Sequence, residues 1–272
     1  MTVVALTIAG SDSSGGAGIQ ADLKTFAAFG VFGASAITAL TAQNTRGVVA
    51  ISNLEPTFVA AQIDAVADDF TIAAAKTGML SRAAIIGAVA DRIRTRKIPN
   101  LVVDPVMAAA SGDVLLEPDA IEMMRTAMLP IAAVVTPNLH EARILTGRDV
   151  TDVSQMREAA RACVGLGARA ALVKGGGLAG NAVDILFDGR DFHEFSAPRI
   201  APKGAPGRAH GAGCTLSAAI AAALARGESL VGAIDAAKRY VTLALQHAPQ
   251  IGHGSRPLNH LVAAPAARGG KD

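Results

Sequence analysis

Residues 209–215 read AHGAGCT, and they directly precede a long alanine-rich stretch for which helical spacing predicts a helix at 213–226. Gly211 and Gly213 permit backbone conformations with positive φ and a close approach of the chain to a ligand. The first N–H groups of a helix lack intrahelical acceptors, and the positive end of the helix dipole lies beside them. This turn is therefore a candidate anion site.

Cys214 lies within this candidate anion site. A thiol at a helix N-terminus ionises more easily than a free thiol, so Cys214 could serve as a base or a nucleophile. Two simpler interpretations stay open: a Gly-x-Gly turn can be only a tight connection, and a lone cysteine is often a small core residue. The rest of the chain has to decide between them.

The composition predicts a globular protein with a large core. The 272 residues are 51% hydrophobic and 18% charged, and a chain of this length buries about 75% of its unfolded surface. No apolar run reaches the roughly 18 residues of a membrane span, and the N-terminus lacks the features of a signal peptide. Cys163, which has helical core spacing, and Cys214 cannot form a disulfide framework. We expect a cytoplasmic protein that does not engage a membrane.

Charge and aromatic content argue against nucleic-acid binding. The formal net charge is only +2, and 3% of the residues are aromatic, with no Trp. Nucleic-acid binding requires clustered positive charge, and single strands also need aromatic side chains for base stacking. We therefore expect no nucleic-acid partner.

Short β-branched segments alternate with longer amphipathic ones along the chain. This alternation predicts βα units and a mainly parallel sheet covered by helices on both faces. The Asp188-Gly189 pair indicates a hairpin turn, and Ala/Pro/Gly-rich sequence from 257 suggests a flexible C-terminal tail at 257–272 after one domain at 1–256. The expected strands are 3–9, 34–40, 72–76, 100–104, 132–136 and 170–174, followed by a hairpin at 181–198 and helices at 213–226 and 229–247.

Polar residues follow each expected parallel strand. Ligands of open α/β sheets bind at the carboxyl ends of the strands, so these residues are candidates for one crevice. They are Gly10 to Asp12, Gln43 and Asn44, Lys76 to Met79, Asp104, Thr136 to Asn138, and Lys174 to Gly177.

The segment 10–22, GSDSSGGAGIQAD, looks like a phosphate loop but lacks both the P-loop ending and the Rossmann spacing. It begins a helix with apolar residues at Ile19 and Phe26, and Asp22 lies beside this stripe. A carboxylate there needs a partner. Asp22 is either a first-turn acid stabilised by the helix dipole or a residue that faces the crevice.

These segments together closely resemble the hydroxymethylpyrimidine/phosphomethylpyrimidine kinases of thiamine biosynthesis. The resemblance covers roughly residues 3–250 and implies a ribokinase-like three-layer α/β/α fold with a central, mostly parallel sheet. The motifs that carry it are GSDSSGGAGIQAD at 10–22, AQNT at 42–45, KTGML at 76–80, DPVM at 104–107, SGD at 111–113, TPNL at 136–139, VKGG at 173–176 and HGAGCT at 210–215.

The resemblance implies an ATP-dependent kinase that works with Mg²⁺. Its substrate would be 4-amino-5-hydroxymethyl-2-methylpyrimidine, which is phosphorylated to the monophosphate and then to the diphosphate. The resemblance also implies a homodimer. The alternatives are a pyridoxine/pyridoxal kinase and a sensor that binds the pyrimidine without transferring phosphate.

The resemblance also assigns roles to individual residues of this chain. The catalytic group would be the turn Gly211, Ala212, Gly213 and Cys214 with Lys174 and Asp22. The pyrimidine would be bound by Gly10, Asp12, Gln43, Met79 and Val106. ATP would be bound by Lys174, Asn138 and Thr215, and the metal by Asp104 and Glu141.

Several of these residues also have purely structural interpretations. Glu141 and Asn138 form a possible capping box, Gln43 can cap a strand end, and Met79 can be plain core. The histidines His140, His193, His247, His253 and His260 lack metal-ligand spacing, and we expect them at the surface.

The chain departs from the family pattern around the central turn. Ala212 replaces the usual Thr, Gly207-Arg208-Ala209 replaces an Asn-Thr pair before His210, and Gly177 and Ala110 replace a His and a Lys or Thr. Nucleotide affinity and the second phosphorylation are the properties that these changes bear on most.

Overall fold

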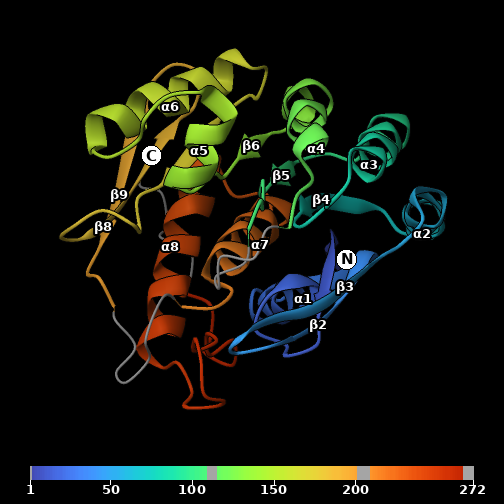
Figure 1. The fold of residues 1–272 in the computed structure, drawn as a ribbon, viewed down its shortest axis with the longest axis horizontal. Helices are drawn as coiled ribbons and strands as arrows, with labels where there is room; N and C mark the ends of the chain where they lie inside the picture. The colour runs from blue at the N-terminus through green and yellow to red at the C-terminus, as the bar shows by residue number, and fades with distance from the viewer. Residues whose placement is uncertain (1, 109–114, 201–208, 266–272) are drawn as a thin grey trace.

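The computed structural model describes residues 2–108, 115–200 and 209–265, and these residues form one nine-stranded sheet with helices on both faces (Figure 1). The strand order is β3-β2-β1-β4-β5-β6-β7-β8-β9. The six strands from β2 to β7 in this order run parallel, and the antiparallel strands β3, β8 and β9 lie at the two edges. The strands are β1 (Val4–Asp12), β2 (Phe32–Asn44), β3 (Gly47–Asn53), β4 (Ile72–Thr77), β5 (Leu101–Val103), β6 (Val134–Val135), β7 (Ala171–Lys174), β8 (Ala182–Phe187) and β9 (Phe192–Ala197).

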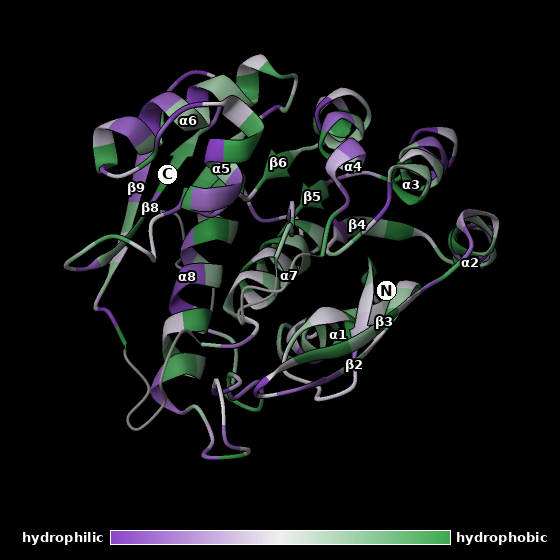
Figure 2. Ribbon diagram, viewed as in Figure 1, coloured by the Kyte–Doolittle hydropathy of each residue, from purple (hydrophilic) through white to green (hydrophobic). Residues whose placement is uncertain are grey.

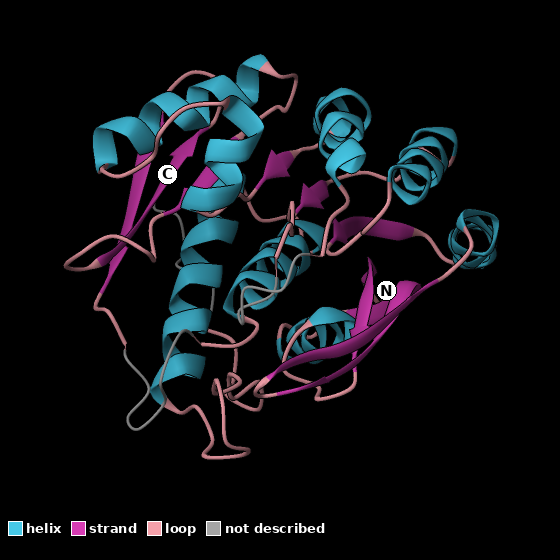
Figure 3. Cartoon of the chain, in the orientation of Figure 1, coloured by secondary structure: helices cyan, strands magenta, loops and turns pink. Residues whose placement is uncertain are grey.

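The helices make two outer layers (Figure 3). One layer holds α1 (Gly18–Ala28), α7 (Ala212–Ala225) and α8 (Leu230–Gln246). The other holds α2 (Pro56–Asp69), α3 (Ala83–Thr95), α4 (Pro118–Met123), α5 (Leu139–Thr146) and α6 (Val153–Gly165). The expected three-layer α/β/α fold with a mostly parallel sheet is confirmed.

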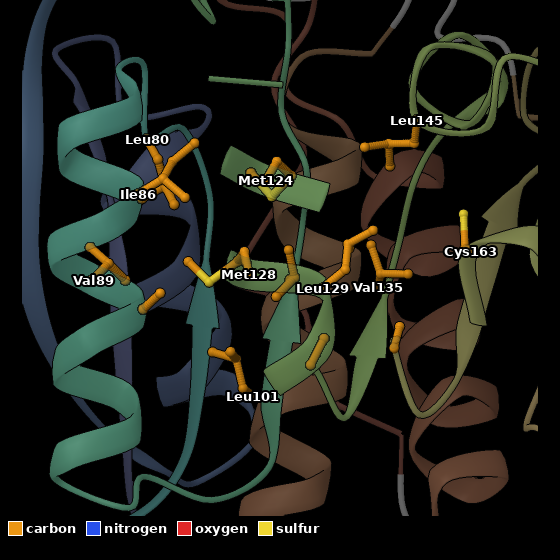
Figure 4. Close-up of a cluster of buried hydrophobic side chains, with 14 of the residues drawn as sticks. Leu80, Ile86, Val89, Leu101, Met124, Met128, Leu129, Val135, Leu145 and Cys163 are labelled. Atoms are coloured by element: carbon orange, nitrogen blue, oxygen red, sulfur yellow. The ribbon is translucent and has the colours of Figure 1, made fainter. Parts of the chain in front are cut away.

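A separate apolar core fills each space between sheet and helices. Alternating strand residues supply the two cores, so that Val103 of β5 packs on the α3 side and Val102 on the α7 side. Because both faces are covered, the short central strands β5 and β6 are hydrophobic throughout (Figure 2). Figure 4 shows the first core, in which Ile86 and Val89 of α3 lie opposite Leu101 and Met128. Cys163 belongs to this core, as its spacing predicts.

Helix α7 is buried nearly all round. Its residues from Thr215 to Ala223 are buried between the sheet, α1 and α8. Alanine side chains let these layers approach closely, which explains the alanine-rich sequence. The helix begins after Gly211, whose φ of 85° is in the left-handed region that glycine favours.

Two parts of the chain differ from the sequence-based expectation. Strand β3 was not predicted, because as an edge strand it exposes both faces and has no alternation. The segment from residue 257 packs against the domain and does not extend away from it as a flexible tail. Pro257 forms a parallel β-bridge with His210, and the Tyr240 hydroxyl donates to the carbonyl of His260 at 3.1 Å. Residues 266–272 of the expected tail lie outside the described residues. No helix among the described residues could cross a lipid bilayer.

Leu258 tests whether the C-terminal segment contributes to the core. Its side chain is 3% exposed in the α7–α8 core, so Leu258→Ala should lower the free energy of unfolding by about 2–3 kcal/mol. Leu261, which is 93% exposed, is the matched control, and Leu261→Ala should leave stability unchanged. Urea unfolding of the two variants measures both values. Equal stability of the two would mean that the segment does not pack in solution.

Candidate functional site

The first turn of α7 meets the carboxyl ends of the parallel strands. A Cβ at Gly213 would lie 3.3 Å from Lys174 Nζ and 3.8 Å from Asp104 Oδ2, so the turn passes directly over these side chains. A Cβ at Gly211 would overlap the carbonyl oxygen of Gly16. The turn is therefore wedged between the N-terminal loop and the ends of β5 and β7.

Lys174 and Asp104 form a buried ion pair beneath this turn. Lys174 Nζ lies 2.8 Å from Asp104 Oδ1, and the Ser217 hydroxyl of α7 lies 3.2 Å from Asp104 Oδ2. Burial lowers the pKa of Lys174, but the carboxylates of Asp104 and Glu141 raise it more, and the net shift is upward. Lys174 thus keeps its positive charge at the carboxyl edge of the sheet.

Glu141 forms the capping box of α5 with Asn138. The Glu141 N–H donates to Asn138 Oδ1 at 3.0 Å, and the Asn138 N–H donates to Glu141 Oε2 at 2.7 Å. The capping-box interpretation is confirmed. Glu141 Oε2 also lies 4.0 Å from Lys174 Nζ. Burial raises the pKa of Glu141 to about 7, against the opposing effect of Lys174.

Asp12 organises the N-terminal loop. Its carboxylate accepts hydrogen bonds from the N–H groups of Ser14 and Ala17 and from the Ser14 hydroxyl, and Oδ2 lies 2.7 Å from His210 Nε2. Burial raises its pKa, but the hydrogen bonds from His210 and Ser14 outweigh this and hold the pKa at about 2. Asp12 therefore ties the N-terminal loop to the residue before Gly211.

The other predicted pyrimidine-binding residues are near this loop or near Asp104. A Cβ at Gly10 would lie 2.6 Å from Met79 Cε, so these two residues touch. The Gln43 amide lies 3.5 Å from His210 Nε2 and accepts from the Thr41 hydroxyl at 3.0 Å. Val106 follows β5, and its N–H donates to the carbonyl of Asp104 at 2.8 Å.

Asp22 is fully buried in an ion pair with Lys76. Lys76 Nζ lies 2.7 Å from Asp22 Oδ2, and neither side chain is exposed. Asp22 is the fifth residue of α1, so it is neither a first-turn acid nor a residue facing an open crevice. Both alternatives were wrong because the carboxylate has a partner inside the protein.

Burial, and not the helix dipole, dominates at Cys214. It raises the pKa of the Cys214 thiol to about 11, although Lys76 and a hydrogen bond from the Gly18 N–H act in the opposite direction. The expectation of an easily ionised thiol is therefore wrong for the ligand-free chain. The dipole argument omits desolvation, which disfavours the charged form of a buried thiol.

Thr215 and His260 lie behind the turn. The Thr215 hydroxyl lies 2.9 Å from the Gly211 carbonyl oxygen and 2.9 Å from His260 Nε2, and it has no exposed surface. The surface expectation is wrong for His260, which is buried, and burial lowers its pKa to about 4. It is correct for His140, His247 and His253. His193 is half-buried and pairs with Asp188 at 2.8 Å.

Sequence reasoning gave no individual role to three further charged residues, of which only Lys76 was among the candidates for the crevice. Lys76 is one, and a lysine inside the apolar strand Ile72–Thr77 is itself a signal for a buried partner. Asp184 and Lys238 are the others: Asp184 accepts from the Gly175 N–H at 3.0 Å and from Lys238 Nζ at 2.7 Å, and so holds the loop after β7. The motif Ser111–Asp113 lies outside the described residues.

Comparison with known proteins identifies the family. The family model for phosphomethylpyrimidine kinase matches residues 12–259. The chain belongs to this family. It is 52% identical to the hydroxymethylpyrimidine/phosphomethylpyrimidine kinase of Rhizobium meliloti over 264 residues, which are 96% of this chain and 97% of the relative. It is 50% identical to a bifunctional thiamine biosynthesis protein of Geobacter sulfurreducens, of which it spans about half, 53%, while 97% of this chain is covered.

A solved structure confirms the ribokinase-like fold. The ADP complex of Bacillus subtilis pyridoxal kinase matches this member of the phosphomethylpyrimidine kinase family with a TM-score of 0.87 and 37% identity, over 96% of this chain and 98% of that one. The fold is therefore shared by kinases named for two different heterocyclic substrates.

Gly211 is the residue whose replacement should damage the site most selectively. Gly211→Ala combines a φ of 85° with an overlap between the new Cβ and Gly16, so the turn must shift, and kcat/KM should fall on the order of 100-fold. Gly227, just past the other end of α7, has a φ of 86°, and a Cβ placed there would have no described atom within 4 Å. Gly227→Ala should lower the stability of the protein, because alanine disfavours a positive φ, but should leave its activity unchanged. Steady-state kinetics and thermal unfolding compare them, and equal activity of the two variants would contradict the role of the turn.

Proposed function

We propose that this chain is the ATP-dependent kinase that phosphorylates 4-amino-5-hydroxymethyl-2-methylpyrimidine to its monophosphate and then to the diphosphate. The observation that carries the proposal is the first turn of α7, which lies directly over the Lys174–Asp104 pair. Family membership over residues 12–259 supports the same reaction.

Phosphoryl transfer needs two oxygens held in line and compensation of negative charge on the transferred group. The N–H groups of Ala212, Gly213 and Cys214 begin α7, and no side chain among the described residues caps them. They are free to form an anion hole together with the N-cap residue Gly211. Lys174 would add a fixed cation beside the same phosphate oxygens.

Asp104 and Glu141 are the residues that would hold Mg²⁺. The described residues contain no cluster of three or more His, Cys, Asp or Glu side chains suited to a metal. Mg²⁺ nevertheless fits here, because it usually takes one or two carboxylates and completes its shell with water and phosphate oxygens. The ion would neutralise phosphate charge. We further propose Lys174 and Asn138 as ATP contacts, whereas the Thr215 hydroxyl would act by supporting Gly211.

The pyrimidine would occupy the space bordered by Gly10, Gln43, Met79 and Val106. The Gln43 amide offers a donor and an acceptor to the edge of an aminopyrimidine, and Met79 offers a polarisable apolar wall. Asp12 would act on this pocket by fixing the N-terminal loop and His210. Few polar groups would then determine substrate choice.

Cys214 would accept the proton of the substrate hydroxyl in the first phosphorylation. The second step starts from a phosphate monoester, which is already an anionic nucleophile and needs no base. Cys214→Ser should therefore reduce the first rate constant by about 100-fold or more and the second by less than about tenfold. Separate assays starting from the alcohol and from the monophosphate measure the two steps. Equal losses, or none, would remove Cys214 from the base role.

One time course tests the proposed function as a whole. The chain is incubated with Mg-ATP and the pyrimidine alcohol, and monophosphate and diphosphate are resolved over time, with pyridoxal as a parallel substrate. Appearance of monophosphate followed by diphosphate is expected. A faster reaction with pyridoxal would favour a pyridoxal kinase, in line with the structural similarity to that enzyme. Binding of the pyrimidine without turnover would indicate a sensor.

We also propose a cytoplasmic homodimer in which residues 2–265 act as one kinase domain. The β2–β3 edge supports the dimer: Val49 and Ile51 of β3 and Leu40 of β2 are exposed apolar side chains on a strand edge that lacks a neighbour among the described residues. Exposed apolar edge strands usually require cover, and a second copy would provide it. ATP as substrate and free cysteines are consistent with the cytoplasm.

Val49 is the residue to test for dimer formation. Val49 is 78% exposed, so Val49→Lys should not unfold the chain but should place a charge in the interface and give a monomer. Light scattering after size-exclusion chromatography measures the mass. Val231→Lys, at an exposed apolar residue of α8, should retain the dimer. A monomeric wild type, or equal masses for both variants, would contradict this interface.

A further inference from the structure

The ion pair between Lys76 and Asp22 is a charged pair near the α7 turn for which the proposed reaction has no use. Both side chains are fully buried, with Nζ and Oδ2 2.7 Å apart. A buried pair of this kind is seldom needed for stability, since apolar residues of similar volume often serve as well or better. Stability alone therefore does not explain why this ion pair lies near the first turn of α7.

The pair lies on two elements that contact the α7 turn. Lys76 is on β4 and Asp22 is on α1, and α7 packs against both elements. The first residue of α1, Gly18, donates its N–H to the sulfur of Cys214. Gly78 follows β4 so closely that a Cβ there would lie 2.9 Å from Lys76 Nζ. The ammonium group is thus held in one position under the site.

The hydrogen bonds of Asp22 are unevenly shared between its two oxygens. The Thr7 hydroxyl and Lys76 Nζ both donate to Oδ2, each at 2.7 Å, whereas Oδ1 is buried and has no hydrogen-bond partner among the described residues. An unpaired buried carboxylate oxygen is costly, and burial raises the pKa of Asp22 despite Lys76. Asp22 thus fixes the position of the Lys76 ammonium group through Oδ2, while its own charge is only partly compensated by hydrogen bonds.

Four charged groups influence Cys214 from the surrounding elements: Lys76 on β4, Asp22 on α1, Asp104 after β5 and Lys174 on β7. Lys174 already forms ion pairs with Asp104 and Glu141, and the phosphate groups of ATP would interact with the same ammonium group. Lys76 is fully buried, and its ion pair with Asp22 involves neither Asp104 nor Glu141. The proposed contacts to ATP and Mg²⁺ therefore leave Lys76 as a cation that they do not use.

We propose that Lys76 and Asp22 form a positioning pair that sets how much negative charge the Cys214 sulfur can carry. Lys76 supplies the positive potential that favours the thiolate, and Asp22 holds the ammonium in place and limits its effect. The pair acts through Cys214 and touches no substrate. The proposal rests on the proposed role of Cys214 as base, but its test does not depend on turnover.

The test measures the ionisation of Cys214 directly. A Cys163→Ala background leaves Cys214 as the single thiol of the full chain, and its rate of alkylation by iodoacetamide is recorded against pH without substrate. Asp22→Asn removes the negative charge beside Lys76 and should raise the alkylation rate at pH 8 about tenfold, which corresponds to one unit of thiol pKa. Lys76→Met should lower that rate about tenfold, and Lys76→Arg should restore most of it.

The opposite signs of these effects separate an electrostatic role from a structural one. If the pair only supported the fold, both variants would loosen the site and both would increase alkylation, which would overturn the proposal, as would no change in either. Asp64→Asn, which breaks a surface ion pair with Arg96, is the control and should leave the rate unchanged. Should a charge variant fail to fold, Thr7→Val removes one hydrogen bond to Asp22 Oδ2 and should raise the rate in the direction of Asp22→Asn.

Kinetic assays of the same variants distinguish failure of this proposal from failure of the base role. In Asp22→Asn, the acid limb of the pH profile for the first phosphorylation should shift to lower pH, while the second phosphorylation should keep its profile. Opposite alkylation shifts with no change in the first-step profile would uphold the pair and overturn the base role of Cys214. An unchanged alkylation rate in both charge variants would overturn the proposed effect of Lys76 and Asp22 on Cys214, whatever the kinetics of Cys214→Ser.

Discussion

The close contact between Gly211 and Gly16 is the constraint on which the site depends. There is no room for a Cβ at residue 211, and its positive φ turns the chain into α7 directly against the N-terminal loop. The same junction is stabilised by the pair between Asp12 and His210, which are 198 residues apart in the sequence. Because α7 starts here, Gly213 comes to lie over Lys174, and the Cys214 sulfur comes within reach of the Gly18 N–H. A small displacement of this junction would separate the proposed anion hole from Lys174.

Desolvation is the second constraint, and it explains the paired charges around α7. Lys76 and Lys174 each have a carboxylate partner at 2.7–2.8 Å, because an isolated ammonium group at this depth would lose its proton. The same burial raises the pKa of the Cys214 thiol to about 11. Binding of ATP phosphate would change the balance around Lys174, whereas the Lys76–Asp22 pair lies deeper and would stay as it is. Without a ligand, each of these two lysines is therefore balanced by a carboxylate of its own.

The sequence predicts what local patterns determine, and it misses what only tertiary contacts determine. The central parallel strands could be located because burial on both faces makes them apolar, and polar residues mark the carboxyl ends of all six parallel strands. Strand β3 has no such pattern because both of its faces are exposed. The partners of Asp22 and His260 are 54 and 45 residues away, so spacing could not reveal them. The desolvation that suppresses ionisation of Cys214 likewise arises from the packing of α7 against the sheet and α1.

Ala212, one of the departures from the family pattern, affects the site less than the sequence alone suggests. Ala212 lacks the hydroxyl of the usual Thr, but the N-terminus of α7 has no side-chain cap among the described residues, so the proposed anion hole would consist of main-chain N–H groups, which any residue except Pro supplies. The turn depends instead on Gly211, where a Cβ would meet Gly16, and on Gly213, where it would lie against Lys174. Both glycines are retained. A substitution at residue 212 can thus weaken one phosphate contact, whereas a side chain at either glycine would close the space that the transferred phosphate needs.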